Sequence, residues 1–199
     1  MVLGLDFDNT IIKYDELFHR VAFEKNLIPA DLPKEKNTVR NYLREKNIED
    51  EWTIIQGEVY GDRIKEAIPF KGMLETLEKL RIKRIPINII SHKTRIPYLG
   101  PKIDLHAAAI NWMKLNHFFD HYGLNFKKNQ IYFEETKEEK IDRIMTNGCT
   151  HYVDDLPEIL EMIPKGITKI LFCPNQSKNS NMDWTVINAW KELPRILLK

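Results

Sequence analysis

The chain has 199 residues, of which 43% are hydrophobic and 30% charged, and its formal net charge is +1. A chain of this length and composition accommodates one folded domain with a modest insertion, which excludes a disordered protein. The balanced charge provides no global field that would attract nucleic acid or an anionic membrane. We therefore expect neither nucleic acid nor a membrane as a partner.

The two cysteines and the N-terminal residues indicate the compartment. Cys149 and Cys173 are far apart in the sequence, which favours two buried thiols over a disulfide or a metal-binding pair. No basic leader precedes an apolar stretch at the N-terminus, and no segment has the roughly 18 apolar residues needed to span a bilayer. These features predict a cytoplasmic protein and leave its oligomeric state open.

Short apolar runs alternate with helical patterns along the chain. Several runs lack polar alternates, as do strands that are covered on both faces of a parallel sheet. The periodic segments between them, such as 71–81, 105–113 and 157–163, predict crossover helices. This alternation predicts a doubly wound, Rossmann-like α/β fold with a mainly parallel five-stranded sheet. The expected strands are 2–7, 86–90, 130–133, 150–153 and 168–172.

The first connection is too long for a single crossover helix. About 80 residues separate the first two expected strands, where a crossover helix needs about 15 to 25. Residues 13–68 are therefore surplus, and their apolar spacing predicts helices. We expect them to form a small helical cap inserted into an α/β core of residues 1–12 and 69–199. Within that core, residues 174–181 are rich in Asn, Ser and Gln and predict a loop.

Polar and acidic side chains follow four of the expected strands. Ligands of open α/β sheets bind at the carboxyl ends of the strands. Carboxylates packed together there repel one another unless a cation joins them, and hard oxygen ligands suit Mg²⁺. A hydroxyl group and a lysine suit the oxygens of a phosphate. The segments in question are Asp6-Phe7-Asp8-Asn9-Thr10, Ser91-His92-Lys93, Thr136-Lys137 and Asp154-Asp155.

Each of these features taken alone also has a purely structural explanation. An aspartate at a strand end is commonly a turn former or a helix cap, and Asp154 or Asp155 could cap the predicted helix 157–163. Thr136 and Glu139 form a capping-box pattern in which Lys137 is the first helical residue. The occurrence of such residues at four strand ends favours the functional interpretation.

At these residues the chain resembles the haloacid-dehalogenase-like (HAD) superfamily, in its phosphatase branch. Asp6-x-Asp8-x-Thr10 resembles the first motif of that family and Ile89-Ile90-Ser91 the second. Lys137 resembles the third motif, with Lys140 as the alternative, and Val153-Asp154-Asp155 resembles the fourth. Asn9 stands where a glycine is usual in the family.

The resemblance implies a role for each of these residues. Asp6 would be the nucleophile and Asp8 the general acid and then the general base. Asp6, the backbone carbonyl of Asp8 and Asp154 would hold Mg²⁺, and Asp155 would bind the ion directly or through water. Ser91 and Lys137 would bind the phosphoryl oxygens, and Thr10 and His92 would complete the contacts with the substrate.

The implied function is a Mg²⁺-dependent phosphatase that hydrolyses a small phosphorylated metabolite through an aspartyl-phosphate. Asp8 favours this branch, because family members that cleave carbon–halogen bonds lack the second acid. Two alternatives remain open at this point. One is a phosphomutase, which uses the same first residues, and the other is a non-catalytic module that accepts or binds phosphate.

Overall fold

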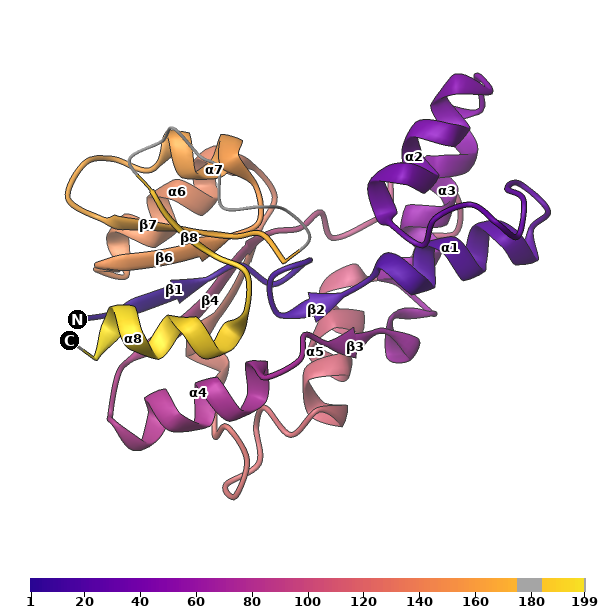
Figure 1. Cartoon of the computed structure of the whole chain (residues 1–199). Coiled ribbons are helices and arrows are strands. Elements are labelled where there is room, and N and C mark those ends of the chain that lie inside the picture. Colours follow the sequence, from indigo (N-terminus) through magenta and orange to yellow (C-terminus); the bar gives the residue numbers. More distant parts are fainter. Residues whose placement is uncertain (175–183, 199) are drawn as a thin grey trace. The chain divides into compact units, whose positions relative to one another are not determined.

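The computed structural model describes residues 1–174 and 184–198, and its main feature is a parallel sheet of six strands. The strand order is β5-β4-β1-β6-β7-β8, and every neighbouring pair is parallel (Figure 1). The strands are β1 (Leu3–Leu5), β4 (Ile87–His92), β5 (Ile131–Glu134), β6 (His151–Asp154), β7 (Thr168–Phe172) and β8 (Thr185–Ile187). This is the α/β fold predicted from the alternation of strands and helices.

The sheet has one strand more than the five expected. The sixth, β8, is only three residues long, with Thr185 exposed and Ile187 buried. Such a segment is too short for its periodicity to identify it as a strand. The loop expected at residues 174–181 lies, from residue 175 onward, outside the described residues.

The strand order changes direction at β1, which is central in the sheet. From β1 the chain forms β4 and β5 on one side and then returns to form β6, β7 and β8 on the other. The carboxyl ends of β1, β4 and β6 therefore meet at the switch point of the sheet, where open α/β proteins bind their ligands.

Helices cover both faces of this sheet. Figure 1 shows α6 (Lys137–Thr146) and α7 (Pro157–Met162) on one face and α4 (Met73–Ile82) and α8 (Leu193–Leu197) on the other. On the face of α6 and α7, a core cluster includes Ile90, Ile144, Tyr152 and Leu160, all fully buried. Burial of these strands on both faces explains their near-continuous apolar sequence. Two 3₁₀ helices, η2 (Lys128–Gln130) and η3 (Trp190–Glu192), complete this part of the chain.

The chain divides into two compact units. The first, which contains the sheet, comprises Met1–Ile12, Pro69–Lys93 and His117–Lys199, and the second comprises Lys13–Ile68 and Thr94–Asn116. Two short strands, β2 (Ile12–Lys13) and β3 (Ile68–Pro69), pair in a sheet of their own. Residues 94–116 thus belong to the second unit, whereas we had expected them in the α/β core.

The second unit is helical. It contains α1 (Asp15–Glu24), α2 (Lys36–Glu45), α3 (Glu49–Tyr60), the 3₁₀ helix η1 (Ile64–Glu66) and α5 (Leu105–Leu115). The helix α5 joins this unit because its apolar face packs on α3 and η1, and because the indole of Trp112 donates to the carbonyl of Ala67 at 2.8 Å. The ring of Phe18 stacks on Trp52 at 4.8 Å, so these aromatic side chains form the core of the unit.

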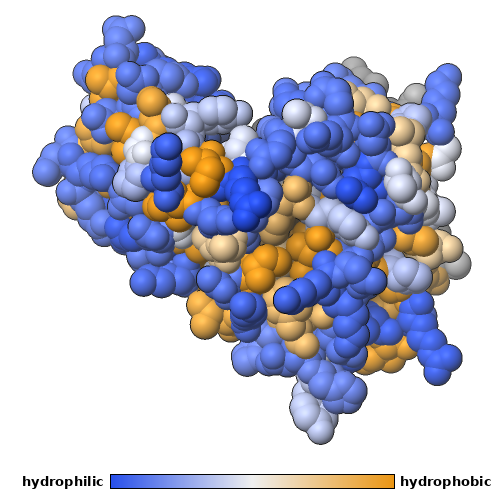
Figure 2. All heavy atoms as spheres, turned by 180° about the vertical axis from the view of Figure 1, so that it is seen from behind, coloured by the Kyte–Doolittle hydropathy of each residue, from blue (hydrophilic) through white to orange (hydrophobic). Residues whose placement is uncertain are grey.

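The surface of the protein is mixed in polarity. On the face drawn in Figure 2, hydrophilic side chains predominate and apolar side chains reach the surface between them. The most exposed large apolar residues include Tyr122, Tyr98 and Ile82. Among the described residues, no helix combines the length and the apolar character needed to cross a membrane.

Candidate functional site

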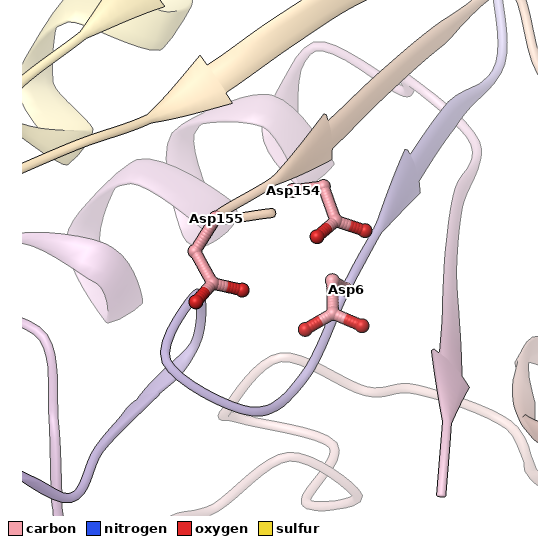
Figure 3. Close-up of side chains that lie close together, drawn as sticks. All are labelled: Asp6, Asp154 and Asp155. Carbon is pink, nitrogen blue, oxygen red and sulfur yellow. The ribbon is translucent and has the colours of Figure 1, made fainter. Parts of the chain in front are cut away.

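Three carboxylates converge at the switch point of the sheet. Asp6 directly follows β1, whereas Asp154 and Asp155 come from the end of β6 (Figure 3). One carboxylate oxygen of each residue lies within 4.8 Å of those of the other two. Asp6 and Asp154 are buried, and Asp155 is half-buried. The parallel pairing of β1 with β6, with Leu5 opposite Val153, brings the two strand ends together.

Lys140, and not Lys137, extends its amine to these acids. The Nζ of Lys140 donates to Asp6 Oδ1 and to Asp154 Oδ2, at 2.7 Å in each case, and the side chain is 2% exposed. Lys137 instead donates to Glu158 at 3.0 Å and is 39% exposed. Of the two lysines considered for this role, Lys140 lies beside the acids and Lys137, which we had preferred, does not.

The start of α6 explains this difference between the two lysines. Thr136 is the N-cap and forms a capping box with Glu139, so Lys137 is the first residue of the helix, as predicted. Lys140 lies next to the buried residue Ile141 on the face of the helix that packs on the sheet. Lys137 and Lys140 are three residues apart, which is nearly one helical turn. Only Lys140 lies among the buried residues of α6, so only its side chain reaches the strand ends.

The surroundings of Asp6 raise its pKa. Ser91, near the end of β4, donates its hydroxyl hydrogen to Asp6 Oδ1 at 2.9 Å. Burial raises the pKa of Asp6 from 3.8 to about 7; Lys140 opposes this rise, whereas the carboxylates of Asp154 and Asp8 add to it. Burial alone would lower the pKa of Lys140, but Asp154 and Asp6 raise it well above its ordinary value. The ammonium of Lys140 is thus the cation that partly neutralises the clustered acids.

Asp154 has a second, structural role. Its Oδ1 accepts a hydrogen bond from the backbone N–H of Leu156 at 2.9 Å, immediately before α7. The capping explanation considered for this residue therefore applies to one of its oxygens, while the other oxygen accepts from Lys140. A single carboxylate with four lone-pair sites can serve both partners.

Asp8 is paired with a lysine that the sequence did not single out as a site residue. The Nζ of Lys93 donates to both carboxylate oxygens of Asp8, at 3.0 Å and 2.7 Å, and its side chain is 2% exposed. Lys93 directly follows the end of β4 at His92. The only sequence signal for its position is its distance of two residues from Ser91.

The turn between Asp8 and Thr10 depends on Asn9. Asn9 has a φ of 58°, and its N–H donates to the carbonyl of Ile12 at 2.9 Å. Glycine adopts this left-handed conformation readily, and asparagine is one of the few other residues that tolerate it. The departure from the usual glycine is therefore compatible with a tight turn that returns the chain from Asp8 to β2.

The two remaining predicted contacts differ in burial. Thr10 is fully buried, and its Oγ1 has no hydrogen-bond partner among the described residues, while its carbonyl accepts from the indole of Trp190 at 3.0 Å. His92 is half-buried, and its Nε2 lies 3.1 Å from the carbonyl oxygen of Glu135. The position of His92 is therefore accounted for by a structural contact with the loop after β5.

The donor set suits a hard divalent cation. Asp6, Asp154 and Asp155 offer only carboxylate oxygens, and no cysteine or histidine takes part in this group. Oxygen ligands of this kind are preferred by Mg²⁺, which commonly binds one or two carboxylates together with water and a phosphate. The residues present are thus compatible with a magnesium ion.

The sequence of the chain matches no protein-family model and no curated protein. Its structure, however, is similar to several solved structures over nearly the whole length of both chains. One is a HAD-superfamily hydrolase of subfamily IA, variant 1, from Geobacter sulfurreducens, with 12% identity, a TM-score of 0.59, and coverage of 98% of this chain and 95% of the other.

Two other structures are similar to the same degree. A HAD-superfamily hydrolase from Ehrlichia chaffeensis has 14% identity, a TM-score of 0.56, and coverage of 99% of this chain and 95% of the other. A predicted phosphoglycolate phosphatase from Haemophilus somnus has 12% identity, a TM-score of 0.54, and coverage of 98% and 97%. The chain therefore has the fold of HAD-superfamily hydrolases. Dehalogenases also have this fold, so the fold does not distinguish phosphatases from them.

Proposed function

We propose that this chain is a Mg²⁺-dependent phosphatase of the HAD superfamily that acts on a small phosphorylated metabolite. The observation that carries the proposal is the environment of Asp6, whose Oδ1 accepts hydrogen bonds from both Ser91 and Lys140. A hydroxyl and an ammonium that converge on a buried carboxylate are also suited to bind the oxygens of a phosphoryl group beside it. The second acid, Asp8, favours phosphoryl transfer over carbon–halogen cleavage.

In the proposed reaction, one carboxylate oxygen of Asp6 attacks phosphorus, and the bond from phosphorus to the leaving oxygen breaks. Asp8 gives its proton to that oxygen, so the alcohol leaves as a neutral molecule. Asp8 then accepts a proton from water, whose oxygen attacks the same phosphorus. This second step releases inorganic phosphate and restores the Asp6 carboxylate.

The other residues of the site position the reactants and balance charge. Lys140 and Ser91 would contact the phosphoryl oxygens, and Lys93 would hold the Asp8 carboxylate in place through its two hydrogen bonds. Asp6, Asp154 and Asp155, with the backbone carbonyl of Asp8, would hold Mg²⁺. When bound, the ion supplies positive charge that reduces the repulsion between the Asp6 carboxylate and the phosphate.

We also propose that the second compact unit is the cap domain of this enzyme. The sequence of its first segment interrupts the α/β core directly after Asp6-x-Asp8-x-Thr10, where we had expected an inserted helical cap. A cap of this kind excludes water from the reaction of a small substrate. The addition of residues 94–116 enlarges the proposed cap beyond the segment 13–68 that we had expected.

The decisive experiment is a phosphatase screen over phosphorylated metabolites with Mg²⁺, in which the wild type is compared with Asp6→Asn. The amide has nearly the same shape as the carboxylate but cannot attack phosphorus, so we expect activity to fall to the background while the fold is retained. Wild-type turnover by the variant would refute the mechanism. Release of halide from an L-2-haloacid, without release of phosphate from any member of the panel, would refute the choice of branch.

Removal of the metal tests the second part of the proposal. EDTA should abolish activity, and added Mg²⁺ should restore it, while Ca²⁺ should inhibit because its looser coordination misplaces the reacting atoms. Full activity of a metal-stripped sample would contradict the proposal. Transfer of the phosphoryl group to a second hydroxyl of the substrate, without release of phosphate, would identify a phosphomutase instead.

A further inference from the structure

A cavity lies at the edge of the sheet opposite the candidate site. Its volume is about 140 Å³, and it is lined by α4, the start of β4 and the segment 124–130. Ile87, the first residue of β4, lines the cavity, whereas Ser91 lies near the other end of the same strand. At about 3.3 Å per residue, these positions are about 13 Å apart along the strand. The cavity is therefore separate from the candidate active site, and it lies entirely within the first compact unit.

Apolar side chains form about half of the lining of this cavity. They include Leu77 from α4, Ile87 from β4, and Leu124 and Phe126 from the segment before η2. All four side chains are buried. An apolar cavity of roughly 150 Å³ engineered in another protein binds benzene. The present cavity can therefore accept an apolar body about the size of one aromatic ring.

The polar groups of the lining favour a negatively charged ligand. Arg81, on the last turn of α4, lines the cavity, and its Nε is buried without a hydrogen-bond partner among the described residues. A buried donor without a partner is unfavourable, and a ligand that accepts its hydrogen bond would remove that penalty. No aspartate or glutamate lines the cavity, so the wall itself supplies no carboxylate to Arg81.

Two further cations, Lys127 and Arg84, belong to the segments that line the cavity. Asn125 lines the cavity, and its side-chain oxygen accepts from the Nζ of Lys127 at 2.8 Å. Arg84 is exposed one residue before Ile85, another lining residue. Gln130 donates to the carbonyl of Ile87 at 2.9 Å and accepts from the N–H of Lys127 at 2.8 Å, which ties the two sides of the cavity together.

From this arrangement we infer a binding site for a small amphipathic carboxylate, whose apolar body enters the cavity and whose carboxylate accepts from Arg81. The planar guanidinium matches the geometry of a carboxylate and can form two parallel hydrogen bonds with it. The apolar side chains of the lining distinguish such a ligand from a nucleic acid or another polyanion, which would contact only the exposed cations. This site is independent of the proposed phosphatase activity.

Benzoate is a suitable probe, with benzamide as its neutral counterpart of nearly the same shape. Binding is measured by titration calorimetry without Mg²⁺, and its location by the chemical shifts of backbone amides. Benzoate should bind the wild type saturably and shift amides of residues 77–87 and 124–130. Benzamide should bind about 10- to 100-fold more weakly, because hydrogen bonds to charged groups contribute about 1.5 to 3 kcal/mol.

Two variants separate the contribution of Arg81 from that of general positive charge. Arg81→Gln should weaken the binding of benzoate by about the same factor as the replacement of benzoate by benzamide does. Arg84→Asn removes an exposed charge on the same segment and keeps a residue that tolerates the positive φ of 59° at this position. It should change the affinity less than about twofold, because exposed charges are screened.

Several results would overturn the inference. They are the absence of saturable benzoate binding to the wild type, equal affinities for benzoate and benzamide, and equal effects of the two substitutions. Amide shifts confined to the surroundings of Asp6 and Ser91 would also overturn it, because benzoate would then occupy the candidate active site. Binding of an oligonucleotide, with no binding of benzoate, would identify the basic segment as a polyanion surface instead.

Discussion

At the carboxyl edge of the main sheet the buried ammonium of Lys140 lies between Asp6 and Asp154, whereas at the amino edge the buried Nε of Arg81 has no hydrogen-bond partner among the described residues. Removing either partner of a buried ion pair leaves an uncompensated charge. Loss of Lys140 should therefore destabilise the fold strongly. The Nε of Arg81 has no such partner among the described residues, so removal of Arg81 should cost little stability. Lys140 is buried and Arg81 is half-buried, and from the difference in their partners we expect their removal to have different energetic consequences.

Apart from loss of the nucleophile Asp6, the largest expected effect concerns Asp8 at the carboxyl edge. General acid catalysis typically contributes about 10²- to 10⁴-fold, and it matters only when the leaving group is basic. Asp8→Asn should therefore lose far more rate on an alkyl phosphate than on para-nitrophenyl phosphate. The measurement is a single-turnover experiment on phosphoenzyme formation, which excludes effects on the later attack by water. Equal losses on both substrates would show that Asp8 has a structural or metal-binding role only.

The two lysines of α6 form a matched pair for the next test. Lys140→Met should reduce kcat/KM about 10²- to 10³-fold, as expected for removal of a donor to the phosphoryl group. It should also lower the free energy of unfolding by about 3 to 5 kcal/mol without metal, because Asp6 and Asp154 lose their shared cation. Lys137→Met should change both quantities little, because its ion pair with Glu158 is exposed.

Added Mg²⁺ sharpens this test, because an ion bound only by the folded state stabilises it. Chemical denaturation of Lys140→Met should therefore show a larger gain in stability with Mg²⁺ than denaturation of Lys137→Met does. A Lys137→Met variant that loses activity while Lys140→Met retains it would refute the placement of Lys140 at the site.

A smaller effect is expected for Lys93, which we regard as a positioning residue. Lys93→Met should lower kcat about 10-fold, since a misplaced acid loses only part of its contribution. The loss should be greater for alkyl phosphates than for para-nitrophenyl phosphate, because Lys93 acts through Asp8. Lys93→Arg, which can donate to both oxygens of Asp8, should recover part of the rate. A uniform loss on all substrates would indicate that Lys93 only supports the fold.

The smallest effect is expected at the amino edge. Arg81→Gln should leave the free energy of unfolding unchanged or raise it slightly in the absence of ligand, because the substitution loses no partner of the Nε among the described residues and removes a buried donor that has none there. Chemical denaturation, with Arg84→Asn as the control, provides the measurement. A loss as large as that of Lys140→Met would show that Arg81 has a structural partner and would remove the contrast between the two edges.

Much of the fold could be predicted because strands buried on both faces have a distinctive sequence. Apolar runs identified β1, β4, β5, β6 and β7, and the position of residues 13–68 between the first two strands indicated an insertion. The short strand β8 could not be predicted, because three residues show no periodicity and the strand forms only by pairing with β7. Residues 105–113 were correctly predicted to be helical, but the unit to which α5 belongs depends on its packing.

Some residues of the candidate site could likewise be predicted from the sequence, and others could not. Asp6, Ser91 and Asp154 follow strands that a reader of the sequence can locate, and parallel strands that pair bring their ends together. Lys140 lies within a helix, where the choice among neighbouring lysines requires the rotation of that helix relative to the sheet. Lys93 could not be assigned to Asp8 either, because the length of β4 determines whether its side chain turns inward.

The sequence by itself therefore determined five of the six strands of the main sheet, the acids that follow them and the chemistry that those acids favour, because each follows from local pattern and residue type. Only the tertiary structure decided which cation faces which acid: Lys140 faces Asp6 and Asp154, and Lys93 faces Asp8. These pairs join residues that are 14 to 134 positions apart in the chain. Their formation depends on helix rotation and strand register, which the packing of the whole core determines.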